Sequence, residues 1–145
     1  MYRRVFLDAN VIADIYDESR PYHKQSDRAI TLLVQDRSIE LFTSCDIITT
    51  IYYILSKKNR NYALDAILQI NELCTIVEFG NDEVLRSCML MKKNNLYKDL
   101  EDTIQYTMAQ KESCDLILSN DRGFVSEEIE LMCSEDFTSG DDKSH

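Results

Sequence analysis

Hydrophobic residues along this chain form short continuous runs that alternate with longer segments of helical spacing. The runs at 3–8, 39–44, 74–79 and 114–120 contain β-branched and aromatic side chains with few polar breaks, which favours buried strands. A further run at 129–134 fits a fifth strand. Strands separated by helices predict an α/β fold with a central, mainly parallel sheet of four or five strands.

The segments between these runs carry apolar residues at the spacing of an amphipathic helix. The predicted helices start at Val11 and cover residues 11–16, 23–37, 46–57, 61–73, 81–93 and 100–113. Asn10, Asp46 and either Asn81 or Asp82 are predicted to cap helices. In the helix over 61–73, one side is predicted to present Leu64, Ile67, Leu68 and Leu73.

Length and composition predict a single domain. The chain has 145 residues, 44% of them hydrophobic, with one Pro and three Gly, and it shows no repeat or linker. The domain is expected to cover residues 1–138, followed by a polar, acidic tail at 139–145. No apolar stretch approaches the roughly 20 residues of a membrane-spanning helix, so no membrane partner is expected.

Charge and cysteine content narrow the functional classes. The net charge of −10 disfavours binding of nucleic acid through overall charge, but it permits a local basic rim or a pocket that holds a cation. Five scattered cysteines without a C-x-x-C pair indicate reduced thiols and a cytoplasmic protein. Catalysis by histidine would rest on His23, which lies in a polar segment and is expected to be solvated.

Acidic residues follow three of the predicted strands. Asp8 ends the first strand, Asp46 follows the second, and Asn120 and Asp121 follow the fourth. Because the carboxyl ends of parallel strands meet at one edge of a sheet, these side chains are expected to gather there.

Two further acids begin the helix over 100–113. Asp99 and Asp102 are three residues apart and therefore share a face of the helix start, whereas Glu101 is expected to point elsewhere into solvent. Asp46 and Asp99 have a plainer interpretation as helix caps, and Asp102 alone would be a surface acid. Asp121 alone would be a turn residue.

A group of carboxylates in one cleft repels itself unless it holds a cation. Oxygen ligands without histidine or cysteine suit Mg²⁺ or Mn²⁺. Such an ion activates water and stabilises charge on a phosphodiester, so the pattern predicts a hydrolase that acts on phosphodiester bonds.

Four segments, in order over residues 3 to 124, resemble the PIN-domain family of metal-dependent nucleases, which includes VapC-type toxins. The segments are FLDANVIADIY, TSCDIITTIYYILSK, DLEDTIQYTMA and CDLILSNDRGF. The resemblance implies a three-layer α/β sandwich, an acidic pocket for Mg²⁺ or Mn²⁺, and endoribonuclease activity on RNA.

Carried over by position, the resemblance assigns Asp8 to the first family acid and Asp102 to the third. Asp121 matches the acid of the family's T-N-D-x-x-F pattern, with Ser119 and Asn120 placed to support the metal. Asp99 resembles an extra acid that some relatives carry one turn earlier.

The second family acid, usually Glu, falls on Thr50, and Asp46 one turn earlier is a possible substitute. If neither is a ligand, the chain is instead a catalytically weak or inactive PIN-fold binding module. Phosphoryl transfer through an aspartyl intermediate fits less well, because Asn10 stands where a second acid is needed.

The resemblance also implies partners. An antitoxin protein is expected beside the RNA substrate, and Arg122, adjacent to Asp121, is the preferred candidate for substrate contact. The basic runs at 56–61 and 91–98 are alternatives, although both also fit solvated helix ends. The TIYYIL and MLM runs fit either a homodimer interface or the core.

Overall fold

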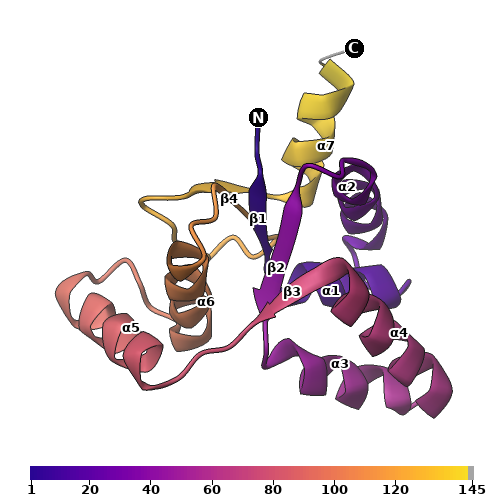
Figure 1. Ribbon diagram of the computed structural model, residues 1–145, viewed down its shortest axis with the longest axis horizontal. Helices are drawn as coiled ribbons and strands as arrows, with labels where there is room; N and C mark the ends of the chain where they lie inside the picture. The colour runs from indigo at the N-terminus through magenta and orange to yellow at the C-terminus, as the bar shows by residue number, and fades with distance from the viewer. Residues whose placement is uncertain (144–145) are drawn as a thin grey trace.

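The computed structural model describes residues 1–143, with the side chains described through residue 140. Its centre is a five-stranded sheet with every neighbouring pair parallel, in the order β3-β2-β1-β4-β5 (Figure 1). The strands are β1 Arg4–Leu7, β2 Glu40–Ser44, β3 Cys74–Val77, β4 Leu116–Leu118 and β5 Glu130–Met132. The predicted α/β class and parallel sheet are confirmed.

Seven helices surround the sheet within the described residues. They are α1 Ala9–Tyr16, α2 His23–Gln35, α3 Ile47–Ser56, α4 Arg60–Leu73, α5 Asn81–Lys93, α6 Leu100–Lys111 and α7 Ser134–Lys143. None of these described helices is both long enough and apolar enough to cross a membrane.

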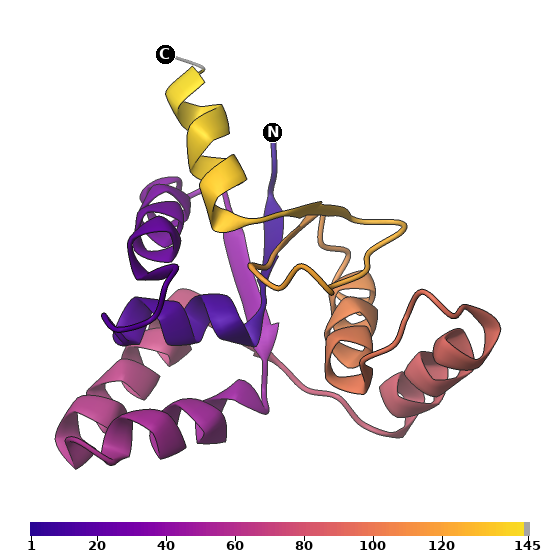
Figure 2. The ribbon, with the colours of Figure 1, turned by 180° about the vertical axis from the view of Figure 1, so that it is seen from behind.

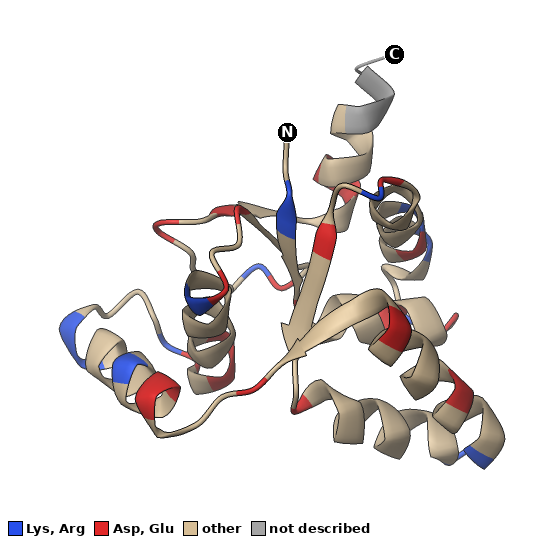
Figure 3. Ribbon diagram, viewed as in Figure 1, with Lys and Arg blue, Asp and Glu red and all other residues tan. Residues whose placement is uncertain are grey.

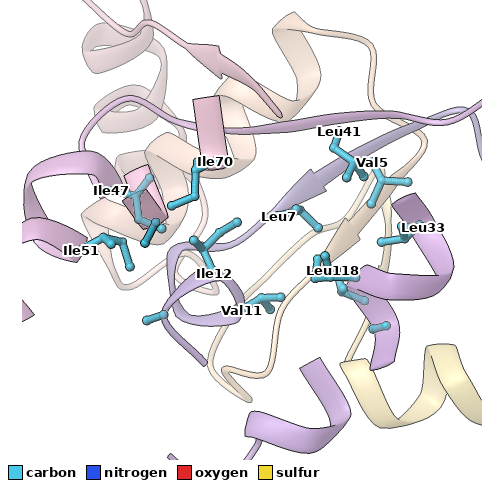
Figure 4. Close-up of a cluster of buried hydrophobic side chains, with 14 of the residues drawn as sticks. Val5, Leu7, Val11, Ile12, Leu33, Leu41, Ile47, Ile51, Ile70 and Leu118 are labelled. Atoms are coloured by element: carbon cyan, nitrogen blue, oxygen red, sulfur yellow. The ribbon is translucent and has the colours of Figure 1, made fainter. Parts of the chain in front are cut away.

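Alternation along the strands divides the core into two layers. Val5 and Leu7 of β1 face one side, where they join residues of α1, α2, α3 and α4 in the larger cluster (Figure 4). Phe6 faces the other side and joins a second cluster that includes Tyr106 and Met108 of α6. Figure 2 shows α6 next to the sheet with α5 outside it. The result is the predicted three-layer sandwich.

Two predicted caps are wrong. Asp8, not Asn10, occupies the N-cap of α1, so the helix begins two residues earlier than predicted. Gly80 occupies the N-cap of α5, and its backbone N–H donates to the Glu83 carboxylate at 2.9 Å. Asp46 does occupy the N-cap of α3, although its side chain makes no capping hydrogen bond there.

The side of α4 that faces the core is not the side that carries Leu64 and Leu68. Ala63, Ala66 and Ile70 are buried, whereas Leu68 is 65% exposed and Leu64 is 36% exposed. Small residues let the α4 backbone approach α3 closely, and the bulkier leucines are left on the surface.

Helix α7 was not predicted. It packs against α2, and Phe137 contacts the larger core cluster. The helix continues through residues 139 to 143, the first part of the segment expected to be a polar tail, while residues 144 and 145 lie outside the described part of the chain.

Candidate metal centre

Asp8 lies where β1 passes into α1, at the carboxyl edge of the sheet. Its backbone N–H continues the strand pairing by donating to the Leu118 carbonyl at 3.0 Å, and its own carbonyl accepts the first helical hydrogen bond from Val11. Only 1% of Asp8 is exposed. The short passage from strand to helix therefore holds a carboxylate inside the fold at a fixed place.

Burial raises the pKa of Asp8, and the nearby charge of Asp121 acts in the same direction. Hydrogen bonds from Ser119, Gln105 and the backbone N–H of Asn10 oppose this shift. The Ser119 hydroxyl donates to the Asp8 carboxylate at 2.7 Å. Asp8 is thus oriented by protein donors but has no cationic partner among the described residues.

Asp121 is held beside Asp8 by the loop that follows β4. Its backbone N–H donates to the Ser119 hydroxyl at 3.1 Å, so one serine contacts both acidic residues. Its carboxylate accepts the Gly123 N–H at 2.8 Å. A Cβ at Gly123 would come within 3.3 Å of the same carboxylate oxygen, which makes glycine favourable at this turn.

Asp102 completes the cluster from the first turn of α6. Its pKa is raised to about 8, first by burial and then by the charges of Asp8, Asp121 and Asp99, with a hydrogen bond to Asp121 adding to the shift. Asp99 caps α6 by accepting the Asp102 N–H at 2.9 Å. The structure therefore brings together the four acids that the sequence nominated.

Glu101 is exposed, as expected, but it is close enough to the cluster to be affected by its charge. Burial of part of its side chain and the charges of Asp46, Asp8 and Asp99 raise its pKa. Figure 3 shows acidic residues at the start of α6 and at the start of α3, both near the carboxyl edge of the sheet.

Thr50 does not take the place of an acid. It is exposed, and its hydroxyl is turned back toward the Asp46 carbonyl at 3.5 Å, within its own helix. Asp46 lies at the exposed start of α3, where the buried Ser44 hydroxyl donates to its carboxylate. Of the two candidates for the second acid, Asp46 is the one that has a carboxylate, and its charge reaches Glu101.

Asn120 has a structural role instead of the predicted place near a metal. Its side-chain N–H groups donate to the Asp14 carboxylate at 3.0 Å and to the Ser26 hydroxyl at 2.8 Å, and its oxygen accepts the Ser134 N–H at 2.8 Å. Arg20 pairs with the same buried Asp14 at 2.7 Å. This network lies between α1, α2 and α7 and fixes the residue that precedes Asp121.

Arg122 lies on the exposed surface beside the cluster and forms no ion pair or hydrogen bond with a described residue. It borders a shallow pocket of about 180 Å³ that also includes Asp121, Leu131 and Cys133. Lys98, likewise exposed, borders a small recess on the other side together with Asp99, Asp102 and Gly123. Two free cations therefore flank the acidic cluster.

The chemistry of these donors suits Mg²⁺ or Mn²⁺, because every candidate ligand atom is a carboxylate or hydroxyl oxygen. Among the described side chains, no three His, Cys, Asp or Glu are already arranged to coordinate an ion. Asp8, Asp102 and Asp121 are the residues that would hold such an ion. A positive charge would relieve the repulsion that raises the pKa of Asp102.

Comparison with known proteins agrees with this geometry. The PIN domain family matches residues 5–126, which include Asp8, Asp102 and Asp121. The chain is also 47% identical over 134 residues to a protein named Ribonuclease VapC1 from Aquifex aeolicus (strain VF5), with 92% of each chain covered.

Solved structures share the fold at low sequence identity. One is VapBC2 from Rickettsia felis bound to a DNA fragment from their promoter, with a TM-score of 0.68 and 13% identity over 90% of this chain and 98% of that one. Another is VapC20 from Mycobacterium tuberculosis, a toxin that cleaves the sarcin–ricin loop, with a TM-score of 0.65 and 12% identity over 85% and 98%. Together with the family match, these likenesses show that the chain belongs to the PIN-domain family of VapC-like proteins.

Proposed function

We propose that this protein is an endoribonuclease that hydrolyses RNA phosphodiester bonds with bound Mg²⁺ or Mn²⁺ and acts as the toxin of a toxin–antitoxin pair. The convergence of Asp8, Asp102 and Asp121 at one edge of the sheet carries this proposal. The 47% identity to a protein named as a VapC ribonuclease supports the choice of RNA.

Asp8, Asp102 and Asp121 would hold the ion, with Asp99 close by. When bound, such an ion activates water and stabilises charge on the phosphodiester. Ser119 contributes by orienting both Asp8 and Asp121. Asp102 must release its proton to solvent before it can act as a ligand, so metal binding is expected to strengthen as pH rises toward 8.

The acid missing at Thr50 is replaced in this proposal by carboxylates from other positions. Glu101 approaches from α6 and Asp46 from the start of α3, and the two are close enough for the charge of Asp46 to raise the pKa of Glu101. Together they supply negative charge on the side of the cluster that faces α3.

Arg122 is proposed to contact the substrate, with Lys98 on the other side of the cluster. A polyanion approaching an acidic pocket needs nearby cations, and both side chains are exposed and form no ion pair or hydrogen bond with the part of the chain that the structure describes. The phosphates on either side of the cleaved bond would be their natural ligands.

An antitoxin partner is supported by solved structures that share the fold, which include a VapBC complex. Another is FitAcB from Neisseria gonorrhoeae, with a TM-score of 0.67 and 16% identity over 90% of this chain and 97% of that one. Exposed apolar side chains on α3 and α4 offer area for a protein partner, an antitoxin or a second copy: Tyr52, Tyr53, Tyr62, Leu64 and Leu68. Of the MLM run, Met89 is 48% exposed.

A cytoplasmic location is proposed because all five cysteines are free thiols.

Cleavage of RNA with Mn²⁺ tests the proposal directly. Asp8→Asn removes the buried central carboxylate at almost constant size, and it is expected to lower the cleavage rate at least a hundredfold. Asp65→Asn makes the same chemical change at an exposed site on α4 and is expected to keep the wild-type rate. Equal cleavage by wild type and Asp8→Asn would contradict the assignment of the site.

The alternative function is that of a binding module with the same fold and little or no chemistry. The observation that favours it is Thr50, which stands where the family usually carries an acid. Calorimetry separates the two functions: the absence of any heat of binding with millimolar Mn²⁺ would favour the binding module.

A further inference from the structure

Gln105 is a buried polar residue one turn after Asp102 on α6, and no role in the proposed chemistry has yet been given to it. Only 2% of the residue is exposed. Its side-chain oxygen accepts the backbone N–H of Ala9 at 3.2 Å, which places the amide next to Asp8, and the amide acts to lower the pKa of the Asp8 carboxyl. One side chain therefore joins α6 to the point where β1 becomes α1.

We propose that Gln105 is a positioning residue that orients the Asp8 carboxylate for the divalent cation and fixes its separation from Asp102. The inference rests on the proposed metal-dependent function. It follows from the contacts on both sides of Asp8: Ser119 donates from the β4 loop, and Gln105 approaches from α6.

The position of Gln105 on its helix explains why it suits this task. Residues three apart share a helix face, so Gln105 and Asp102 project from α6 toward the same edge of the sheet. The contact with Ala9 holds the amide from one end and leaves its N–H groups available to Asp8. Groups that orient a metal ligand typically contribute tenfold to a hundredfold to metal affinity.

The test compares wild type, Gln105→Met and Thr107→Val by calorimetry with MnCl₂ and by cleavage at increasing Mn²⁺. Gln105→Met keeps the side-chain length but removes the amide, and with it the hydrogen bond from Ala9 and the polar group next to Asp8. Thr107→Val is the control: Thr107 lies on α6, like Gln105, and the change removes its buried hydroxyl contact of 2.9 Å with Ser87 of α5 without touching the cluster. Thermal unfolding of all three proteins confirms that they are folded.

We expect Gln105→Met to raise the Kd for Mn²⁺ at least tenfold. The Mn²⁺ concentration for half-maximal cleavage should rise by a similar factor, saturating Mn²⁺ should restore most of the rate, and the KM for RNA should change little. Thr107→Val should bind Mn²⁺ like wild type. If Gln105→Met does not fold, Gln105→Asn keeps an amide that is one methylene too short to join Asp8 and Ala9, and the same weakening is expected.

Two results overturn the inference in different ways. A Gln105 variant that folds and binds Mn²⁺ with wild-type affinity, while wild type cleaves RNA with Mn²⁺, contradicts the positioning role alone. A wild-type protein that shows no heat with Mn²⁺ contradicts the proposed function, and the role of Gln105 falls with it.

Discussion

Among the acids at the carboxyl edge of the sheet, Asp102 shows most clearly how crowding changes the pKa of a carboxyl group. Its pKa rises to about 8, first because it is partly buried and then because Asp8, Asp121 and Asp99 are close. In an unfolded chain the same group titrates near 3.9. The folded, metal-free protein therefore holds this proton over a range of pH in which the unfolded chain has lost it.

This difference predicts that the metal-free protein loses stability as pH rises from about 4 to about 8. The native state binds more protons than the unfolded state in this range, so the free energy of unfolding must fall with pH. Asp102→Asn should reduce the slope and stabilise the metal-free protein at pH 8 by about 1 kcal/mol. Urea denaturation at several pH values, with a chelator present, measures this effect.

Some slope should remain in Asp102→Asn, because the pKa of Asp8 is also raised. Asp65→Asn, on the exposed face of α4, should keep the full wild-type slope. An unchanged slope in Asp102→Asn would show that this carboxyl does not carry the shift.

The residues of the metal centre are not equally predictable from the sequence. Asp8 and Asp121 stand directly after buried strands, and parallel strand ends meet, so pattern alone nominated them. Glu101 is exposed, as its position beside Asp102 predicts, and nothing in the sequence indicated that its pKa would be raised by Asp46, Asp8 and Asp99. Gln105 was harder to find than Asp8 and Asp121. It is a polar residue at helical spacing from Asp102, and only the fold shows that its face of α6 is buried.

At the scale of elements, the acidic loop depends on a polar network that ties helices together. Asp14 of α1 accepts hydrogen bonds from Arg20, Ser26 and Asn120, and Ser134 of α7 donates to Asn120. Asp14 is only 3% exposed, so its charge is compensated almost entirely by these neighbours. The network anchors the loop that carries Asp121 to α1, α2 and α7.

Asp14→Ala is expected to lower the free energy of unfolding by about 3 kcal/mol, because it leaves Arg20 and two buried polar groups without their common acceptor. Asp27→Asn on the exposed side of α2 should change it by less than about 0.5 kcal/mol. Urea denaturation measures both variants. A loss below about 1 kcal/mol in Asp14→Ala would mean that the network contributes little to the fold.

Most elements could be predicted because strand runs and helical spacing are strong local signals, whereas the choice of helix face depends on neighbours. Helix α4 buries its alanines because α3 approaches closely, and nothing local distinguishes that face from the leucine face. Helix α7 was missed because its sequence is polar and acidic, and it is stabilised by contact with α2 and by the buried Ser134.

For the whole molecule, the net charge of −10 and the acidic centre both require positive charge to offset the repulsion between carboxylates. Helices α1, α3 and α6 all begin at the carboxyl edge of the sheet, and each brings an acid to its first turn or cap. Helix N-termini favour negative charge, which makes this gathering less costly. The remaining repulsion is what a divalent cation would relieve, while Arg122 and Lys98 offer positive charge to a nucleic-acid substrate.

Anomalous diffraction from crystals grown with Mn²⁺ is the sharpest test of the metal centre, because it locates the ion without reference to activity. We expect a manganese peak within about 2.5 Å of carboxylate oxygens from Asp8 and from Asp102 or Asp121. Crystals soaked in millimolar Mn²⁺ that show no peak between these side chains, or that place the ion on other residues, would contradict the proposed metal centre.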